Sequence, residues 1–449
     1  MPQQAQEAMT AASAPGRIEP QAWMTAPETR AVIAALSAEG AEVRFVGGCV
    51  RDALAGRPVK DVDLATPDRP EMVTALLQAA GLKAVPTGLD HGTVTAVSGH
   101  RPFEITTLRV DVETDGRRAK VAFTDDWQAD AARRDLTFNA MSCRPDGRLF
   151  DPFGGQADLS AGRVRFVGDP RDRIREDYLR LLRFFRFQAH YGRVPPDPQI
   201  LAVARELAPR LGGLSGERIR GEILRLLDAP DPLPVLDLMI GDGLLAAILP
   251  QISETAVLRC LLQLDLPEAA DPVLRLGALL PPGAEVARDV AERLRLSNAE
   301  TAELVMLGEP EAVLGEAAAA LTRGSGDPAV RHALSIALYR AGAAQLRTAL
   351  AIGCARLLAA EPAQRETALA GLQKALGIAV DWQERRFPLG GADVLRLGYS
   401  SGPDVGSLLR AVEDWWIAED FVPDRAACLA RLRQLSERIS PDLPRAPGT

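Results

Sequence analysis

Short apolar runs separated by glycine and polar residues occupy the first third of the chain. Runs rich in β-branched and aromatic residues predict strands, which we place at residues 43–46, 59–64, 92–97, 103–108 and 120–123. Apolar positions at helical spacing predict helices, which we place at residues 28–38, 49–55 and 70–79. Strands and helices mixed in this way indicate a small domain of the mixed α/β type.

Beyond Gly162 the strand pattern nearly vanishes and Ala- and Leu-rich helical periodicity continues to the C-terminus. Clusters of Pro and Gly predict breaks in this helical array near residues 230 and 380. The fold class is therefore α+β, a mixed head followed by an all-α region. We divide the chain into a loose leader (1–22), a head (23–160), a helical neck (161–230), a helical body (231–380) and a helical tail (381–449).

Charge is unfavourable overall for a nucleic-acid partner, because the formal net charge of the 449 residues is −8. Any such partner needs a local basic surface. The segment from Arg163 to Arg193 provides one, since it holds nine arginines against four acidic residues. The aromatic residues among these arginines are expected to belong mainly to the core.

Five widely spaced cysteines, without a CxxC pair, predict reduced thiols in a cytoplasmic protein. No basic segment followed by an apolar run suggests a secretory signal, and no run reaches the length of a membrane span. We therefore expect a cytoplasmic location and no membrane association. The sequence allows no inference about a protein partner.

Two carboxylates, Asp61 and Asp63, lie two residues apart in the predicted strand 59–64. Strand alternation would put both on one face, with Leu64 directed toward a core. Paired carboxylates favour a cation between them, and a hard oxygen site with few protein ligands suits Mg²⁺. In isolation such a pair is more often a solvated surface feature. Glu104, in the strand 103–108, is the best candidate for a third carboxylate, although a solvated strand glutamate explains it equally well.

A glycine turn precedes these carboxylates. Gly47 and Gly48 follow an apolar run and precede a predicted helix, which is the arrangement of a phosphate-binding turn. Arg51 would add a charge-assisted contact to a triphosphate. A plain strand-to-helix turn would need the glycines but not Arg51.

The arginine-rich segment 175–190 has the pattern of one helix. In such a helix Asp177 and Arg180 are neighbours on one face, while Arg183 and Arg186 continue at a spacing that drifts around the helix. Arg186 is then the residue least suited to reach the same ligand as Asp177. A salt bridge within the helix is the alternative interpretation.

Together, these residues resemble a known family, the class II tRNA nucleotidyltransferases and the related bacterial poly(A) polymerases. The resemblance is strong over residues 43–225 and faint beyond. It rests on these segments in order: Gly47–Asp52 with Asp61-Val62-Asp63, Arg133-Arg134-Asp135-Leu136-Thr137-Phe138-Asn139, Asp151-Pro152-Phe153-Gly154-Gly155, Glu176-Asp177-Tyr178-Leu179-Arg180 through Arg183, and Leu214–Ile219.

The resemblance implies a polymerase-β-like nucleotidyltransferase head followed by a helical neck, body and tail. It implies that Asp61 and Asp63 hold Mg²⁺, that Gly48, Arg51 and Arg134 contact the triphosphate or ribose, and that Asp177 and Arg180 read the base. We extend the candidate nucleotide-binding set by the remaining members of these motifs, Gly47, Asp135, Asn139 and Arg183, and by Arg186, which continues the three-residue spacing.

The expected activity is template-independent addition of C and A nucleotides from CTP and ATP to the 3′ end of tRNA. The mechanism needs no protein nucleophile, because Mg²⁺ would activate the 3′-hydroxyl group and stabilise the departing pyrophosphate. A poly(A) polymerase, or an enzyme that adds only part of CCA, shares the same motifs. A non-catalytic RNA-binding helical protein is less consistent with the intact carboxylate pair.

Overall fold

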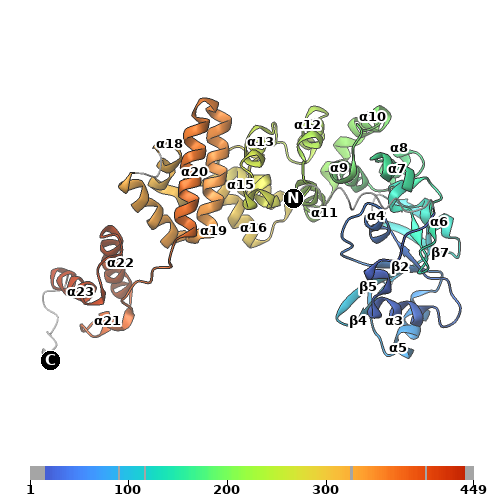
Figure 1. Cartoon of the computed structure of the whole chain (residues 1–449), viewed down its shortest axis with the longest axis horizontal. Helices are drawn as coiled ribbons and strands as arrows, with labels where there is room; N and C mark the ends of the chain where they lie inside the picture. Colours follow the sequence, from blue (N-terminus) through green and yellow to red (C-terminus); the bar gives the residue numbers. More distant parts are fainter. Residues whose placement is uncertain (1–15, 89–91, 116–117, 324–326, 400–401, 440–449) are drawn as a thin grey trace. The chain divides into compact units, whose positions relative to one another are not determined.

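The computed structural model describes residues 16–88, 92–115, 118–323, 327–399 and 402–439. They form two compact units. One contains the residues up to 254 together with 292–296, and the other contains residues 255–291 and those from 297 onward. Figure 1 labels their elements along the chain. The divisions proposed within each unit, at residues 160, 230 and 380, stay predictions.

A mixed seven-stranded sheet forms the head, in the order β3-β4-β5-β2-β1-β8-β9. Strands β2 and β5 pair in parallel and the other neighbours pair antiparallel. A separate two-stranded sheet consists of β6 and β7. The strands are β1 (Arg44–Val46), β2 (Asp63–Thr66), β3 (Lys83–Gly88), β4 (Thr93–Ser98), β5 (Arg101–Thr107), β6 (Arg109–Asp115), β7 (Arg118–Phe123), β8 (Ser142–Cys143) and β9 (Leu149–Phe150).

One face of the seven-stranded sheet is apolar. Phe45, Leu64 and Ile105 are partners in register on β1, β2 and β5, and all three are buried. Helices α3 and α5 pack against the β3–β5 side of the sheet. The head helices are α2 (Ala22–Thr25), α3 (Pro27–Leu36), α4 (Gly48–Leu54), α5 (Pro70–Ala79), α6 (Trp127–Ala132) and α7 (Gly155–Ala161). Because strand residues alternate, the opposite face carries polar residues together with the buried Val46 and Ala65.

Most predicted elements of the head are present. Helices α3, α4 and α5 correspond to the predictions at 28–38, 49–55 and 70–79, and strands β1, β4, β5 and β7 overlap four of the predicted strands. Strands β3, β6, β8 and β9 were not predicted. Strands β8 and β9 have two residues each, too few to produce a pattern, and they exist through pairing with β1 and with each other.

The strand predicted at 59–64 is wrong in its position. Strand β2 begins at Asp63, because β1 and β5 offer pairing partners only to residues 63–66. Pro58 and the exposed Lys60 precede it, and proline cannot donate to a ladder. Asp61 therefore lies outside the strand, and strand alternation does not place it on the face of Asp63.

The N-terminal segment differs in part from the expected loose leader. Residues 1–15 lie outside the described residues. Ile18, however, is 1% exposed, and its backbone N–H donates to the carbonyl of Gly147, while Leu149 donates to the carbonyl of Gly16. Residues 16–22 are thus part of the head.

Five helices follow the head within the first unit: α8 (Pro170–Glu176), α9 (Leu179–Tyr191), α10 (Pro198–Leu207), α11 (Gly216–Leu227) and α12 (Leu233–Gly241). The single helix predicted at 175–190 is wrong, because the chain leaves the helical conformation at Asp177 (φ −155°, ψ 109°). Phe184, Phe185 and Phe187 are buried as expected for core residues. The gap between α11 and α12 matches the break predicted near residue 230.

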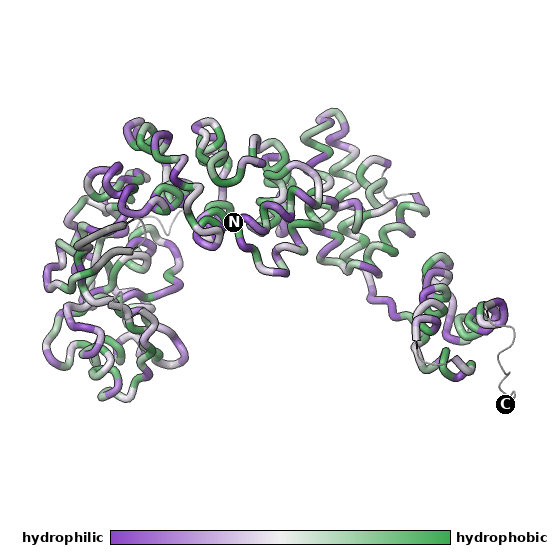
Figure 2. Tube along the Cα trace, turned by 180° about the vertical axis from the view of Figure 1, so that it is seen from behind, coloured by the Kyte–Doolittle hydropathy of each residue, from purple (hydrophilic) through white to green (hydrophobic). Residues whose placement is uncertain are grey.

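Helices α13 (Ala256–Gln263), α14 (Pro272–Gly277), α15 (Ala284–Leu294), α16 (Asn298–Gly308), α17 (Glu311–Leu314), α18 (Ala319–Arg323), α19 (Pro328–Ala360), α20 (Arg365–Val380), α21 (Gly391–Leu395), α22 (Pro403–Ala418) and α23 (Arg425–Ile439) complete the chain. Hydrophobic and hydrophilic residues alternate along these helices, as Figure 2 shows. Leu334, Leu350 and Leu372 belong to one apolar cluster, and Leu408, Trp416 and Leu432 to another. The gap after α20 matches the break predicted near residue 380. Within the described residues, no helix is long and apolar enough to cross a membrane.

Candidate active site

Asp63 and Glu104 are partners in register on the parallel strands β2 and β5. Their neighbours Leu64 and Ile105 face the core, so alternation directs the two carboxylates to the opposite face of the sheet. Burial, and then the negative charges of Glu104 and Asp61, raise the pKa of Asp63 to about 6. The structure therefore brings the three predicted carboxylates into one electrostatic neighbourhood, even though Asp61 precedes the strand.

The chemistry of this neighbourhood fits a divalent cation. Carboxylate oxygens are hard donors, and a cation beside Asp63 would relieve the repulsion that raises its pKa. Among the described residues, no group of three or more Asp, Glu, His or Cys side chains is close enough to hold a metal ion. Asp61 and Asp63 as ligands of Mg²⁺, and Glu104 as a further catalytic carboxylate, stay predictions.

Two arginines flank the predicted glycine turn. Gly47 adopts φ 67°, which favours glycine, and a Cβ atom there would lie 3.3 Å from Nη1 of Arg134. A Cβ atom on Gly48 would lie 3.7 Å from Nη2 of Arg51. The positive charges of Arg134 and Arg51 also act on Asp63, where they oppose the rise of its pKa. We call Gly47, Gly48, Arg51 and Arg134 the phosphate cradle.

A chain of hydrogen bonds connects the phosphate cradle to helix α9. Arg51 Nη1 donates to Asn139 Oδ1 (2.8 Å), and Asn139 Nδ2 donates to Asp135 Oδ1 (3.0 Å). Arg183 on α9 donates to Asp135 Oδ2 through Nε (2.7 Å) and Nη2 (2.6 Å). Although burial favours the neutral acid, the charge of Arg183 and the hydrogen bonds from Asn139 and Arg183 lower the pKa of Asp135 to about 2. Four predicted residues thus form one connected group.

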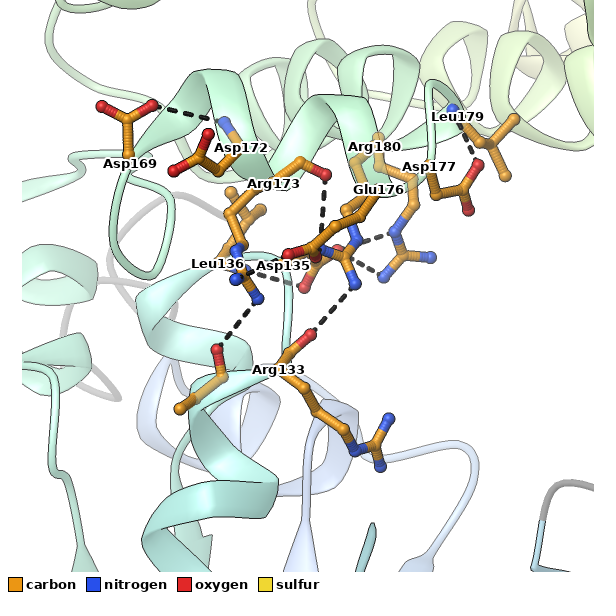
Figure 3. Close-up of polar contacts among 12 residues, drawn as sticks. Arg133, Asp135, Leu136, Asp169, Asp172, Arg173, Glu176, Asp177, Leu179 and Arg180 are labelled. Carbon is orange, nitrogen blue, oxygen red and sulfur yellow. Dashed lines mark hydrogen bonds and ion pairs between the residues drawn. The ribbon is translucent and has the colours of Figure 1, made fainter. Parts of the chain in front are cut away.

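Asp177 and Arg180 lie at the turn between α8 and α9, which we call the base turn (176–180). Asp177 Oδ2 accepts a hydrogen bond from Arg218 of α11 (2.6 Å), and its Oδ1 accepts one from the Leu179 N–H group (3.1 Å). Arg180 donates to Glu176 (2.5 Å) and to the carbonyl oxygen of Arg133 (3.0 Å) (Figure 3). Asp177 and Arg180 therefore do not share a helix face as predicted, because Asp177 is the C-cap residue of α8 and Arg180 lies in the first turn of α9.

Arg186 lies neither in the hydrogen-bonded group that includes Arg183 nor at the base turn. Its side chain is buried, and its Nε lies 3.2 Å from Glu222 Oε2 on α11. Burial lowers the pKa of Arg186 to about 10. Its position indicates a role in packing α9 against α11, and the contact with a nucleotide stays a prediction.

Four residues that position the predicted ones were missed: Asp52, Asp130, Tyr191 and Arg218. Asp130 pairs with Arg134 (3.2 Å) and with Arg133 (2.7 Å). Asp52 and Arg218 lie inside segments that carried the resemblance, so the sequence held a signal for them. Nothing in the sequence distinguished Asp130 or Tyr191.

Comparisons with known proteins agree with this geometry. A family model described as "Poly A polymerase head domain" matches residues 43–165, and one described as "Probable RNA and SrmB- binding site of polymerase A" matches residues 195–255. The mixed sheet, the carboxylates on one of its faces and the arginine-flanked glycine turn define a nucleotidyltransferase head with a helical extension.

Sequence relatives and similar solved structures indicate which nucleotidyltransferases the chain is similar to. CCA tRNA nucleotidyltransferase 1, mitochondrial, of Danio rerio is 36% identical over 410 residues, which are 88% of this chain and 87% of the relative. The human protein of the same name is 49% identical over 195 residues, 42% of this chain and 44% of the relative. The crystal structure of Bacillus stearothermophilus CCA-adding enzyme in complex with CTP is similar with a TM-score of 0.62 at 26% identity, covering 92% of this chain and 98% of that one. The chain belongs to the family of CCA tRNA nucleotidyltransferases.

Proposed function

We propose that this protein adds C and A nucleotides from CTP and ATP to the 3′ end of tRNA, without a nucleic-acid template. The 3′-terminal oxygen of tRNA attacks the α-phosphorus atom, a new O–P bond forms, and the bond to the β-phosphate breaks to release pyrophosphate. The substrates follow from the family and from relatives named for CCA addition.

The observation that carries the proposal is the phosphate cradle beside Asp63. Arg51 and Arg134 flank a glycine turn whose Cα atoms leave room for a close approach, and both act electrostatically on Asp63. Positive groups fixed in this way would align a triphosphate for in-line attack and stabilise the charge that develops. Asp135, Asn139 and Arg183 would hold the cradle against helix α9 and contact the ribose.

Asp61 and Asp63 would hold Mg²⁺, with Glu104 nearby. When bound, Mg²⁺ supplies activation of the attacking hydroxyl group and stabilisation of the leaving pyrophosphate. Asp63 must be ionised to bind it, and the charges of Arg51 and Arg134 favour that form.

Asp177 and Arg180 would select the base. Cytosine and adenine both present an exocyclic amine donor beside a ring-nitrogen acceptor, whereas uracil and guanine present a carbonyl acceptor beside an N–H donor. A carboxylate only accepts hydrogen bonds and a guanidinium only donates them. A carboxylate has about four acceptor positions, so Asp177 could accept from a base amine while it keeps Arg218 and Leu179.

A poly(A) polymerase is the second candidate, because the matched head model carries that description. The purified protein should be incubated with tRNA that lacks its 3′ end, with CTP and ATP separately and together. CCA addition requires both nucleotides and stops after three. Long tails from ATP alone would replace this proposal with the second candidate, and addition of C alone or A alone would reduce it to a partial activity.

We further propose that the protein works in the cytoplasm. The five cysteines are free thiols, the state expected in a reducing compartment. Fractionation of cells that express the tagged full chain tests this location, and enrichment in an organelle, as the names of the mitochondrial relatives suggest for those proteins, would contradict it.

A further inference from the structure

Arg51 of the phosphate cradle is held by a neighbouring carboxylate. Its Nε donates to Asp52 Oδ1 (2.9 Å) and its Nη2 donates to Asp52 Oδ2 (3.0 Å), which is the paired geometry of a strong arginine–carboxylate contact. Because Nη1 donates to Asn139, each of the three guanidinium nitrogens of Arg51 has a hydrogen-bond acceptor, and the side chain is 12% exposed. The orientation of Arg51 therefore depends on the orientation of Asp52.

Asp52 is oriented in turn by Tyr191, the last residue of α9. The Tyr191 hydroxyl group donates to Asp52 Oδ1 (2.5 Å). The ring of Tyr191 lies 4.8 Å from the Arg51 guanidinium carbon and 4.1 Å from that of Arg57, which donates to the carbonyl oxygen of His190. Burial raises the pKa of Tyr191, so the hydroxyl group stays protonated and remains a donor at neutral pH.

We propose that Tyr191 is a positioning residue for the triphosphate of the incoming nucleotide. Its hydroxyl group fixes Asp52, Asp52 fixes Arg51 beside the glycine turn, and its ring supports the guanidinium group from the side of α9. This inference rests on the proposed function. An arginine side chain is rotamer-rich, so fixing it before the nucleotide binds removes an ordering cost from binding.

Helix α9 is then attached to the phosphate cradle at both ends. Near its start, Arg183 holds Asp135, which is connected through Asn139 to Arg51. At its end, Tyr191 reaches Arg51 through Asp52. Because the attachments converge on a phosphate-binding residue, loss of the Tyr191 hydroxyl group should affect CTP and ATP equally and should not alter discrimination between bases.

The first test compares Tyr191→Phe with the parent protein. Binding of CTP, ATP and inorganic tripolyphosphate, each with Mg²⁺, is measured by calorimetry without tRNA, and kcat and KM are measured with tRNA. We expect each of the three dissociation constants and both KM values to rise about three- to tenfold with a smaller change in kcat, since one hydrogen bond to a charged group is lost. Unchanged binding of all three ligands would overturn the inference.

Tyr339→Phe is the matched control. The Tyr339 hydroxyl group also donates to a carboxylate, Glu413, but in the other unit of the chain. It should leave CTP, ATP and tripolyphosphate binding at the parental level. An equal loss in both variants would mean that the effect of Tyr191 is general destabilisation.

A double-mutant cycle with Arg51→Ala identifies the residue through which Tyr191 acts. With Arg51 absent, Tyr191→Phe should have almost no further effect on tripolyphosphate binding, because the two residues act as a unit. An undiminished effect would show that Tyr191 acts through something other than Arg51. Failure of the parent protein to add C or A, with tripolyphosphate binding still dependent on Tyr191, would refute the proposed substrates and leave this positioning role standing.

Discussion

The phosphate cradle and the base turn lie at the two ends of one proposed nucleotide site and differ in how their charged groups are paired. In the cradle, Arg51 and Arg134 are held by Asp52, Asn139 and Asp130, and these contacts orient the arginines toward the glycine turn. At the base turn, Asp177 and Arg180 are engaged with Arg218, Glu176 and backbone groups. In the proposed site, the cradle would therefore be assembled before a triphosphate binds, whereas the base turn would share its hydrogen bonds with an incoming base.

On this proposal, the contacts of the cradle arginines would pre-organise the site for binding, and the contacts of the base turn would decide which base is accepted. Every nucleoside triphosphate carries the same triphosphate group. A rigid cradle would therefore raise the rate of nucleotide addition without discriminating between bases. A base must be compared with its competitors, and unpaired polar groups against the wrong base provide the discrimination. The following predictions test this division from the largest expected effect to the smallest.

Asp63→Ala and Asp61→Ala should reduce nucleotide addition by about a thousandfold or more, because each removes a proposed ligand of the ion that stabilises the transition state. Single-turnover rates with tRNA, CTP and ATP measure the loss, and tRNA affinity should stay nearly unchanged. Asp125→Ala, at an exposed head carboxylate, is the control. Near-normal turnover in either variant would remove that residue from the metal site. Glu104→Gln is the milder test, and full activity there would make it an ordinary strand residue.

Asp177→Ala should lower kcat/KM for CTP and ATP by about a hundredfold and should relax discrimination against UTP and GTP, as expected when a hydrogen-bonding partner of the base is lost. Binding of Mg²⁺-tripolyphosphate should stay at the parental level, since the phosphate cradle is separate. Asp172→Ala, at an exposed carboxylate of α8, controls for charge. A variant that excludes UTP and GTP as well as the parent does would reduce Asp177 to a structural residue of the turn between α8 and α9.

Arg218→Gln should have a smaller effect than Asp177→Ala and should lower the discrimination between CTP and UTP about three- to tenfold. Asp177 keeps its hydrogen bond from Leu179 but loses the one that orients its other oxygen. The measurement is the ratio of kcat/KM for CTP to that for UTP. Arg205→Gln, which removes the exposed ion pair with Asp242 (2.8 Å), is the matched control. Identical ratios in the two variants would show that Arg218 has no part in base selection.

The smallest effect concerns stability and pH. The pKa of Asp63 is raised to about 6 in the folded protein, so folding takes up a proton between about pH 4 and pH 6, and stability in EDTA falls as pH rises through this window. Asp63→Asn removes the free-energy cost of holding an ionised carboxylate at this buried position beside Glu104 and Asp61. It should be more stable than the parent in EDTA at pH 7.5 by up to about 3 kcal/mol, at about 1.4 kcal/mol per pKa unit, and equally stable near pH 4.

Urea unfolding at the two pH values in EDTA measures this difference. Adding Mg²⁺ at pH 7.5 should stabilise the parent more than Asp63→Asn. A pH-independent difference between the two proteins would show that Asp63 is not in the electrostatic neighbourhood that the structure gives it.

The sequence by itself determined the chemistry-bearing segments and the type of fold. Periodicity located helices α3, α4 and α5 and the change to an all-α region, because a 3.6-residue repeat over two or three turns is a local property. The turn at Gly47 and Gly48 could also be predicted from the local sequence, since glycine is favoured where φ is positive, as it is at Gly47. Local patterns failed at strand β2, whose start is set by its partners β1 and β5, and at Asp177, where the chain turns between two helices.

Only the tertiary structure decided which residues act together. Asp135 meets Arg183 across 48 positions of sequence, and Tyr191 meets Asp52 across 139, so no local pattern could connect them. The same holds for Arg186, whose three-residue spacing from Arg183 made it the least suited to the shared ligand, but whose partner Glu222 on α11 no local pattern could name. Hydrogen bonds and ion pairs act over a few ångströms, and the folded chain alone brings distant residues within that range.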